Sequence, residues 1–570
     1  MRTRSLRLAA LSSLLLGSGL LVGLGACGSD APSTPPADAA VPVPTGTAPP
    51  PSDAEPPPPV DASPGVDAGC GSDVPRAPGV LHTEYGAVRG ALDGPIYAYK
   101  NIPYAAPPVG KLRWAAPQAP ACWTGARDGV AWGPQCLQGN VEGDGTSTGV
   151  EDCLQLNVWT PNGAKDRPIL FWIHGGGNQV GSAVQENDGA RVYDGRRLAE
   201  TTNSVVVTVN YRLGMLGFLG HSALAAEGGG TGGTGNYGLQ DLAAAVAWAK
   251  RHAAALGGDP ARLMVFGESA GGLNVCSLLA AKSPVGFSAA AIQSGGCAAR
   301  TLADAQEQGV AVVAAAKCNT APDVLACLRG LAGADLLKAY PTSVNVAGAG
   351  TGWGATVDNA FLDQKPLDVI ASGRHAKVPV VIGANANETS RSVPLRFAAT
   401  DAEYRAAVQT LFGATFGPTV LARYPSASYP SPWAAFVALT SQAKFICPSR
   451  RIAKALTTAG SPAYRYYFDH PLDNSPILKA FGTFHGVDVA YMFGKLDVGG
   501  YTPSEVEKDL SRAFMVYWST HAATGAPGGA GLTAWPKYDP AKDNSLGIGT
   551  TTAVREGLHQ PNCDFWDALQ

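Results

Sequence analysis

The 570-residue chain has no large excess of either charge. Its 42 Lys and Arg residues nearly balance 45 Asp and Glu residues, so the formal net charge at pH 7 is only −3. Proteins that bind nucleic acid usually carry a basic surface, and this composition gives no reason to expect such a partner. Wholesale disorder is also excluded, because hydrophobic residues make up 45% of the chain.

Motifs for metal ions and nucleotides are missing as well. The 11 cysteines include no CxxC pair, and the sequence contains no HExxH motif. We therefore expect no metal site and no cofactor. Because the number of cysteines is odd, at least one of them lies outside any intramolecular disulfide.

Apolar runs long enough to span a bilayer are absent after residue 26. Before it, three arginines precede the apolar stretch 8–24, which is the layout of a secretory signal peptide. The stretch ends in Leu24-Gly25-Ala26-Cys27, which resembles a bacterial lipobox. We expect residues 1–26 to be a lipoprotein signal peptide and Cys27 to be lipidated. The alternative is an ordinary signal peptide in which this cysteine is incidental.

The segment that follows has no Lys, Arg or aromatic residue between residues 29 and 74 and contains several proline runs. Such a composition cannot bury enough apolar area to fold, so residues 27–77 are expected to form a disordered, Pro/Ala-rich, lipid-anchored tether. The anchor would be the only membrane contact. Gly28, where an Asp would indicate inner-membrane retention, favours an exported lipoprotein at the outer membrane, in the periplasm or on the cell surface.

Residues 78–570 alternate short strand-like runs with longer helical stretches, which predicts one α/β domain with a mostly parallel sheet. Apolar residues at helical spacing and a Gly-Gly stop predict a helix over 239–256. Ser504 and Glu507 have the spacing of a capping box that begins a helix running towards Gly525. The expected strands are 169–173, 205–209, 263–266, 289–293, 378–382 and 463–468.

The most informative motif is Gly267-Glu268-Ser269-Ala270-Gly271, which lies between an expected strand and an expected helix. A nucleophilic serine needs a sharp strand-to-helix turn to present its hydroxyl, and flanking glycines allow that turn. The glycines of His174-Gly175-Gly176-Gly177 follow another strand. The amides of Gly176, Gly177 and Ala270 could therefore form an oxyanion hole. A phosphate-binding loop is the alternative, but no Lys-Ser/Thr pair or GxGxxG spacing follows.

Catalysis by a serine also needs a histidine base and an acid that orients it. Of the nine histidines, His485 lies in a loop-like stretch late in the chain, where the base of such a fold belongs. His252, at a helix end, is expected to be an ordinary surface residue. Glu388 follows the expected strand 378–382 and is the predicted acid, with Asp358 and Asp363 as alternatives.

In these motifs the chain resembles the type-B carboxylesterases, the family that includes the cholinesterases, over nearly all of residues 79–570. The resemblance implies an α/β-hydrolase fold, with a large, mostly parallel central sheet flanked by helices. It implies hydrolysis of small-molecule carboxylic esters by Ser269, Glu388 and His485 through an acyl-enzyme. Further matching segments are Asn101-Ile102-Pro103-Tyr104-Ala105, Glu151-Asp152-Cys153-Leu154, Asn210-Tyr211-Arg212, Asn236-Tyr237-Gly238-Leu239-Gln240-Asp241 and Trp535-Pro536-Lys537-Tyr538.

The same resemblance implies three disulfides and two structural ion pairs. Cys70, Cys122, Cys276 and Cys297 remain, and the pairs 70–122 and 276–297 are only one possible choice among them. The implied disulfides are Cys136–Cys153, Cys318–Cys327 and Cys447–Cys563, and the implied ion pairs are Arg113–Glu151 and Arg212–Asp241.

The chain departs from the family in three places. Asn387 and Thr389 flank the acid where many members have Asp and Gly. Asn178 replaces the aromatic residue that often follows the triple glycine in the family. We expect it to make that wall of the gorge leading to the active site more polar. Residues 139–150 contain no Trp, so an aromatic face for a quaternary ammonium group is missing.

These features predict a general carboxylesterase and not a cholinesterase. An amidase or lipase of the same fold is an alternative that the sequence does not separate. A non-catalytic adhesion protein is the alternative from another class, but the intact set of catalytic residues argues against it.

Overall fold

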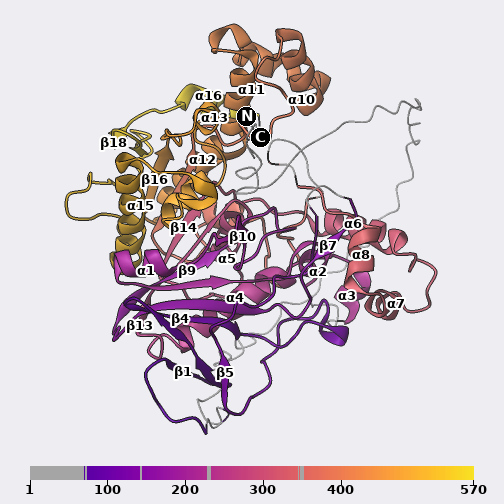
Figure 1. The fold of residues 1–570 in the computed structure, drawn as a ribbon. Helices are drawn as coiled ribbons and strands as arrows, with labels where there is room; N and C mark the ends of the chain where they lie inside the picture. The colour runs from indigo at the N-terminus through magenta and orange to yellow at the C-terminus, as the bar shows by residue number, and fades with distance from the viewer. Residues whose placement is uncertain are drawn as a thin grey trace, which may run out of the picture.

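A computed structural model describes residues 70, 73–140, 144–227, 233–344, 346 and 352–569. The expected signal peptide, Cys27 and residues 28–69 of the expected tether lie outside these residues. In Figure 1 a large sheet crosses the molecule, with helices on both of its faces and with α10 and α11 projecting at the top. The predicted α/β fold class is confirmed.

The central sheet has eleven strands within the described residues, in the order β18-β17-β16-β15-β14-β13-β9-β12-β8-β4-β3. Six of its ten pairings are parallel, and they join the seven neighbouring strands β17, β16, β15, β14, β13, β9 and β12. The pairings at both edges of the sheet are antiparallel. Since parallel strands end at the same edge, their following loops meet there. The strands are β3 (Ala91–Asp93), β4 (Ile96–Pro103), β8 (Gln155–Pro161), β9 (Arg167–Ile173), β12 (Val205–Val209), β13 (Gly258–Glu268), β14 (Ala289–Gln293), β15 (Val380–Asn385), β16 (Ala463–Phe468), β17 (Ser545–Ile548) and β18 (Ala553–Arg555).

Alternation along the strands divides the apolar core into two layers. In β12, Val205, Val207 and Val209 join one hydrophobic cluster and Val206 joins the other, because successive side chains point to opposite faces. Helices α4, α5 and α12 contribute to the first layer, and α1, α14 and α15 contribute to the second. The continuous apolar runs of the central strands are therefore those of a sheet covered on both faces.

Most predicted elements agree with the structure. Helix α15 begins at Glu505 with the predicted capping box of Ser504 and Glu507, and it ends at Thr524 with Gly525 as its C-cap. The six helices named above with the two layers are α1 (Arg196–Thr202), α4 (Tyr237–Arg251), α5 (Ala270–Leu279), α12 (Cys447–Thr458), α14 (Val487–Met492) and α15 (Glu505–Thr524). The others are α2 (Gly214–Phe218), α3 (Ser222–Glu227), α6 (Leu302–Ala315), α7 (Val324–Gly330), α8 (Gly333–Ala339), α9 (Pro366–Ala371), α10 (Asp401–Arg423), α11 (Pro432–Ser441), α13 (Pro476–Phe481) and α16 (Gln560–Ala568).

Two predictions about the end of α4 were wrong. The helix ends at Arg251 instead of residue 256, and His252 is buried instead of exposed. The His252 ring stacks on Trp248 with 4.3 Å between ring centroids, and its Nε2 atom accepts a hydrogen bond from the Glu84 amide. His252 therefore attaches the small sheet of β1 (Val80–Thr83), β2 (Gly86–Arg89) and β5 (Ala126–Asp128) to the end of α4.

The chain joins the folded body earlier than the expected boundary at residue 78. Cys70 forms a disulfide with Cys122, and its amide donates to the Glu84 carbonyl. Asp73 accepts a hydrogen bond from the Gly125 amide. Two residues of the expected tether, Cys70 and Asp73, thus make contacts with the domain.

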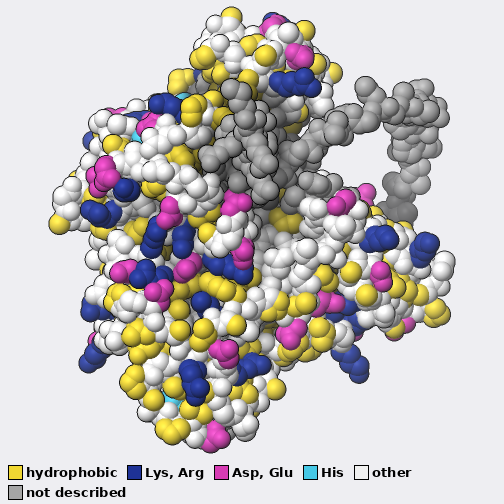
Figure 2. Space-filling model, in the orientation of Figure 1, with side chains coloured by type: hydrophobic (Ala, Val, Ile, Leu, Met, Phe, Trp, Pro, Cys, Tyr) yellow, Lys and Arg dark blue, Asp and Glu magenta, His cyan; other side chains and the backbone are white. Residues whose placement is uncertain are grey.

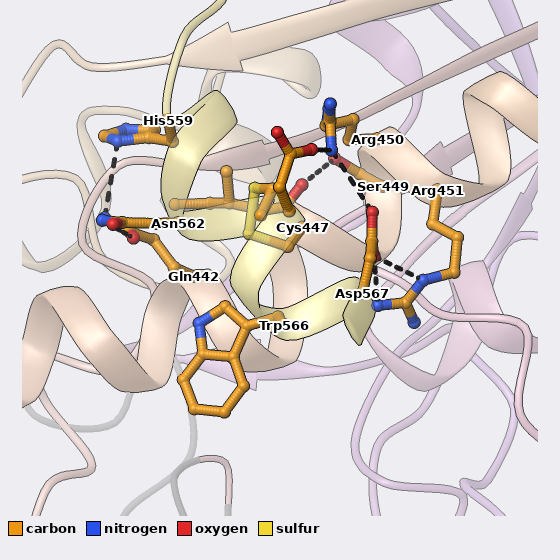
Figure 3. The surroundings of a disulfide bond; sticks show 12 residues. Gln442, Cys447, Ser449, Arg450, Arg451, His559, Asn562, Trp566 and Asp567 are labelled. Carbon is orange, nitrogen blue, oxygen red and sulfur yellow. Dashed lines mark hydrogen bonds and ion pairs between the residues drawn. A yellow bond between two sulfur atoms is a disulfide. The ribbon is translucent and has the colours of Figure 1, made fainter. Parts of the chain in front are cut away.

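The structure contains the three implied disulfides, together with the pairs 70–122 and 276–297 that the sequence left open. Both implied ion pairs are present, each with two hydrogen bonds between guanidinium and carboxylate. In Figure 3 the Cys447–Cys563 disulfide joins α16 to α12, and Asn562 donates to the Gln442 side chain at 2.7 Å. Gln442 begins a π-helix, η3 (Gln442–Ile446), so α16 holds that helix in place.

On the face shown in Figure 2, cationic and anionic side chains are interspersed, without a large field of one sign. Within the described residues, no helix combines the length and the apolarity that a bilayer crossing needs. Nor do the described residues contain a group of His, Cys, Asp and Glu side chains arranged to hold a metal ion.

Candidate active site

Ser269 lies at the sharp turn between β13 and α5. Its backbone has φ 57° and ψ −122°, a conformation that costs energy in a residue with a side chain. Its amide donates to the Gln293 carbonyl at 2.9 Å, which fixes the turn to the end of β14. The serine is half-buried at the carboxyl edge of the parallel sheet. This is the strand–turn–helix setting that the motif predicted.

Close backbone packing explains the glycines on either side of this serine. A Cβ atom on Gly271 would lie 2.1 Å from the Ile173 carbonyl oxygen, and one on Gly267 would lie 2.6 Å from the Gly271 carbonyl carbon. No side chain fits at such distances. The two glycines let α5 begin directly against β9, and the turn takes its shape from that contact.

The glycine loop after β9 lies directly beside Ser269. A Cβ atom on Gly175 would lie 3.1 Å from Ser269 Cβ. Gly176 and Gly177 have φ values of 108° and 64°, which side chains rarely adopt. Among the described residues, none accepts a hydrogen bond from the amides of Gly176, Gly177 or Ala270. These three amides are therefore free to donate to a ligand.

His485 and Glu388 lie together on two neighbouring loops. Glu388 follows β15 by three residues, and His485 lies between α13 and α14. The His485 Nδ1 atom is 2.5 Å from Glu388 Oε2, and the His485 amide donates to the Glu388 carbonyl at 3.0 Å. The other carboxylate oxygen of Glu388 accepts from the Asn385 amide at 2.7 Å. Both Glu388 and His485 are buried.

The two alternative acids make other contacts. Asp358 Oδ1 accepts hydrogen bonds from the amides of Ala360, Phe361 and Leu362, so it shapes a local turn. Asp363 pairs with Arg374 at 2.6 Å. Neither carboxylate approaches His485, and the geometry favours Glu388 as its partner.

A second carboxylate, that of Glu268, faces the same imidazole. His485 Nε2 lies 3.2 Å from Glu268 Oε1, while Ser269 Oγ makes no hydrogen bond with any described residue. This contact was not predicted, although Glu268 lies within the motif 267–271. Its position directly before the serine was the available signal, because adjacent residues at a turn share its surroundings.

Burial and charge shift the pKa values in this cluster. Burial raises the pKa of Glu268 to about 8, against the opposing effect of His485. Burial by itself lowers the pKa of His485, but the carboxylates of Glu268 and Glu388 outweigh it and raise the pKa to about 9. Asp488 is also buried near this imidazole, and burial raises its pKa. The groups are close enough to titrate together.

Asp488 is a second residue that sequence reasoning missed. It accepts hydrogen bonds from the side chains of Gln293 at 2.7 Å and Asn385 at 3.0 Å. Asn385 also donates to the Phe484 carbonyl at 3.0 Å. These contacts connect the ends of β14 and β15 to the loop that carries His485, and no sequence motif indicated them.

Two other polar side chains near the glycine loop, those of His174 and Asn178, are buried. His174 stacks on Tyr211, and burial lowers its pKa to about 4, so it is neutral and packed in the glycine loop. Asn178 does not present a polar surface: its side chain is buried, exchanges hydrogen bonds with Asn274 and accepts one from the Tyr211 hydroxyl. The expectation of a more polar gorge wall at this position was wrong, because the amide is used within that network.

Comparisons with known proteins agree with this geometry. The model of the carboxylesterase family matches residues 77–566. Human cocaine esterase is 32% identical to this chain over 518 residues, which cover 84% of this chain and 88% of the relative. Fumonisin B1 esterase of Sphingopyxis macrogoltabida is 33% identical over 501 residues, which cover 84% of this chain and 88% of that relative. A solved thermophilic PNB esterase superposes with a TM-score of 0.73 at 28% identity, covering 86% of this chain and 100% of its own. The chain belongs to the carboxylesterase family and is a serine hydrolase of carboxylic esters.

Proposed function

We propose that Ser269, Glu388 and His485 form the catalytic triad of this esterase. The observation that carries the proposal is the 2.5 Å contact between His485 Nδ1 and Glu388 Oε2, at the sheet edge where Ser269 occupies its strained turn. A carboxylate at Nδ1 holds the imidazole in the tautomer whose Nε2 atom can accept a proton.

In the proposed reaction, the Ser269 hydroxyl attacks the ester carbonyl carbon and its proton passes to His485 Nε2. Collapse of the tetrahedral intermediate transfers that proton to the alcohol, which leaves. Water then attacks the acyl-serine carbonyl carbon while His485 takes a proton from it. Collapse of the second tetrahedral intermediate breaks the bond to Ser269 Oγ, which receives that proton from His485, and the carboxylic acid leaves. The imidazole must turn from Glu268 to the serine, and catalytic hydrogen bonds of this kind often tighten only when substrate binds.

The free amides of Gly176, Gly177 and Ala270 are the proposed oxyanion hole. Each donor of this type stabilises the transition state by about 3 kcal/mol. The position of Gly175 against Ser269 supports the assignment, because it brings the glycine loop beside the attacking atom.

The proposed substrates are uncharged or simple carboxylic esters, not choline esters. Residues 139–150 contain no Trp that could face a quaternary ammonium group. Residues 141–143 of this segment lie outside the described residues. A panel of p-nitrophenyl esters of graded acyl length, with acetylthiocholine as the comparison, measures this preference directly.

Covalent labelling tests the nucleophile. A fluorophosphonate should modify Ser269, and Ser269→Ala should remove both labelling and turnover while the melting temperature stays near that of the wild type. Loss of one triad member leaves only about 10⁻⁴ to 10⁻⁶ of the rate. An adduct found by mass spectrometry on another serine would refute the assignment.

We also propose that the enzyme is exported and anchored through lipid on Cys27. The lipobox-like sequence at residues 24–27 and the proline-rich segment behind it support this. Wild-type protein should partition into the detergent phase of a Triton X-114 extract, and Cys27→Ser protein into the aqueous phase. Equal partitioning of both would contradict the anchor.

A further inference from the structure

Asn387 and Thr389, the residues on either side of Glu388, both make hydrogen bonds to residues outside their own loop. We propose that Asn387 and Thr389 are positioning residues that hold the Glu388 carboxylate at the Nδ1 atom of His485. The proposal rests on the catalytic roles proposed above for Glu388 and His485.

Asn387 ties the loop of the acid to the loop of the base. The backbone N–H of Asn387 donates to the Thr483 carbonyl at 3.0 Å, and the side-chain Oδ1 atom of Asn387 accepts from the backbone N–H of Thr483 at 3.2 Å. The pair of bonds lies two residues before His485. It runs beside the bond from the His485 amide to the Glu388 carbonyl, so the two loops are connected in the manner of a short ladder.

Thr389 ties the other side of Glu388 to the end of α11. Its hydroxyl lies 2.6 Å from Thr440 Oγ1, and its amide donates to Ser441 Oγ at 3.3 Å. Thr440 in turn donates to the Phe436 carbonyl at 2.7 Å, so its oxygen can accept a hydrogen bond from the Thr389 hydroxyl. Thr389, Thr440 and Ser441 are all fully buried, where an unmade hydrogen bond costs about 1–3 kcal/mol.

The element that receives Thr389 also contacts the base. Ser441 precedes the π-helix η3, and the ring of Phe445 on that helix packs against the His485 ring with 4.8 Å between centroids. The same stretch, from α11 to η3, therefore supports the loop of Glu388 and one face of the imidazole. A displacement of this stretch would therefore change the distance between the Glu388 carboxylate and the His485 imidazole.

The backbone around Glu388 needs the hydrogen bonds of Asn387 and Thr389 because the acid lies beyond the end of its strand. Strand β15 ends at Asn385, so Glu388 is not held by the sheet ladder. A glycine after the acid would be free to adopt many conformations, whereas a threonine with two hydrogen-bond partners fixes one. Misplacement of a catalytic group by about 1 Å costs roughly 100-fold in rate, so these bonds matter for catalysis as well as for stability.

Four variants test the proposal. Thr389→Val removes the hydroxyl and keeps the shape, while Thr389→Ser keeps the hydroxyl. Asn387→Leu removes the acceptor, while Asn387→Asp keeps it. The matched control is Thr208→Val on β12, which removes an equally buried hydroxyl that accepts from Asn157 at 3.1 Å, away from the two catalytic loops.

The expected result for Thr389→Val and Asn387→Leu is a roughly 10- to 100-fold fall in kcat with KM within about twofold. The acidic limb of the kcat/KM profile should also move to lower pH, because a displaced Glu388 stabilises the His485 imidazolium less. The other carboxylates that face this imidazole, Glu268 and Asp488, are unchanged in these variants. Thr389→Ser and Asn387→Asp should restore most of kcat.

Thr208→Val should lower the melting temperature and leave both kcat and the pH limb unchanged. If Thr389→Val and Asn387→Leu behave like this control while Glu388→Gln is inactive, the positioning role is wrong and the triad stands. If Glu388→Gln is fully active, the triad assignment itself fails. Should Thr389→Val not fold, Thr389→Ala removes the hydroxyl without placing a methyl group among its polar partners, and it is judged by the same two measurements.

Discussion

The two halves of the candidate site are built by different means. The nucleophile half, comprising residues 175–177, Ser269 and Ala270, is shaped by backbone packed against backbone, at distances that only glycine allows. The acid–base half, comprising Glu388, His485 and their two loops, is shaped by side-chain hydrogen bonds to neighbouring loops and helices. Its partners are spread over several elements, whereas those of the nucleophile half come from adjacent strands.

This difference decides how each half responds to substitution. Close packing of backbone leaves little room for adjustment, so changes in the nucleophile half act through steric clash. A network of hydrogen bonds can lose one bond and still keep part of its geometry. Removing one of the supporting bonds in the acid–base half should therefore lower activity only partly. Substitutions in each half test this distinction.

The largest effect is expected from the acid itself. Glu388→Gln should lower kcat about 10⁴-fold, because a neutral amide neither holds the required tautomer of His485 nor stabilises its imidazolium. Glu388→Asp, one methylene shorter, should retain part of the activity. Steady-state kinetics with p-nitrophenyl acetate measure both. Near-normal turnover of Glu388→Gln, with Asp358→Asn inactive, would show that the acid has been misassigned.

The nucleophile half was predictable from sequence because its determinants are local. The residues 267–271 and 174–177 each form a contiguous motif, and the strands before them are continuous apolar runs. A glycine needed for close approach cannot be replaced, so the motif remains visible in a single sequence. The sheet was predicted for the same reason, since its central strands are buried on both faces.

The contacts of the acid–base half were not predictable, because they join residues far apart in the chain. Thr389 and Thr440 lie in different elements, and no spacing rule relates them. The same holds for His252 and Glu84, whose contact lies where α4 ends, earlier than the apolar pattern predicted. Likewise, the burial of Asn178 depends on Asn274 and Tyr211, which lie on a helix and a loop elsewhere.

An intermediate effect is expected from a single methyl group in the nucleophile half. A Cβ atom on Gly175 would lie 2.7 Å from Glu268 Oε2 and 2.9 Å from the Glu268 carbonyl oxygen. Gly175→Ala should displace the glycine loop and lower kcat about 10²- to 10³-fold, which is the cost of one lost oxyanion donor. Gly528→Ala is the control, because no atom lies within 4 Å of its added Cβ. Equal activity of the two variants would contradict the packing argument.

The smallest effect in rate, and the sharpest in pH, is expected from Glu268. Only neutral His485 can accept the serine proton, so kcat/KM rises with pH through the pKa of this imidazole. That pKa is raised to about 9 by the carboxylates of Glu268 and Glu388, which places the acidic limb of the wild-type enzyme above pH 7. Glu268→Gln removes one of these charges and leaves the Glu388 contact. The acidic limb should therefore move to lower pH, and the ratio of variant to wild-type activity should be higher at pH 6.5 than at pH 9.

The control is Glu505→Gln on α15, which should leave the acidic limb in place, since the exposed Glu505 carboxylate pairs with Lys508 at the surface. A limb at the same pH in wild type and Glu268→Gln would mean that Glu268 does not act on the base, and that the acid–base half depends on Glu388 alone.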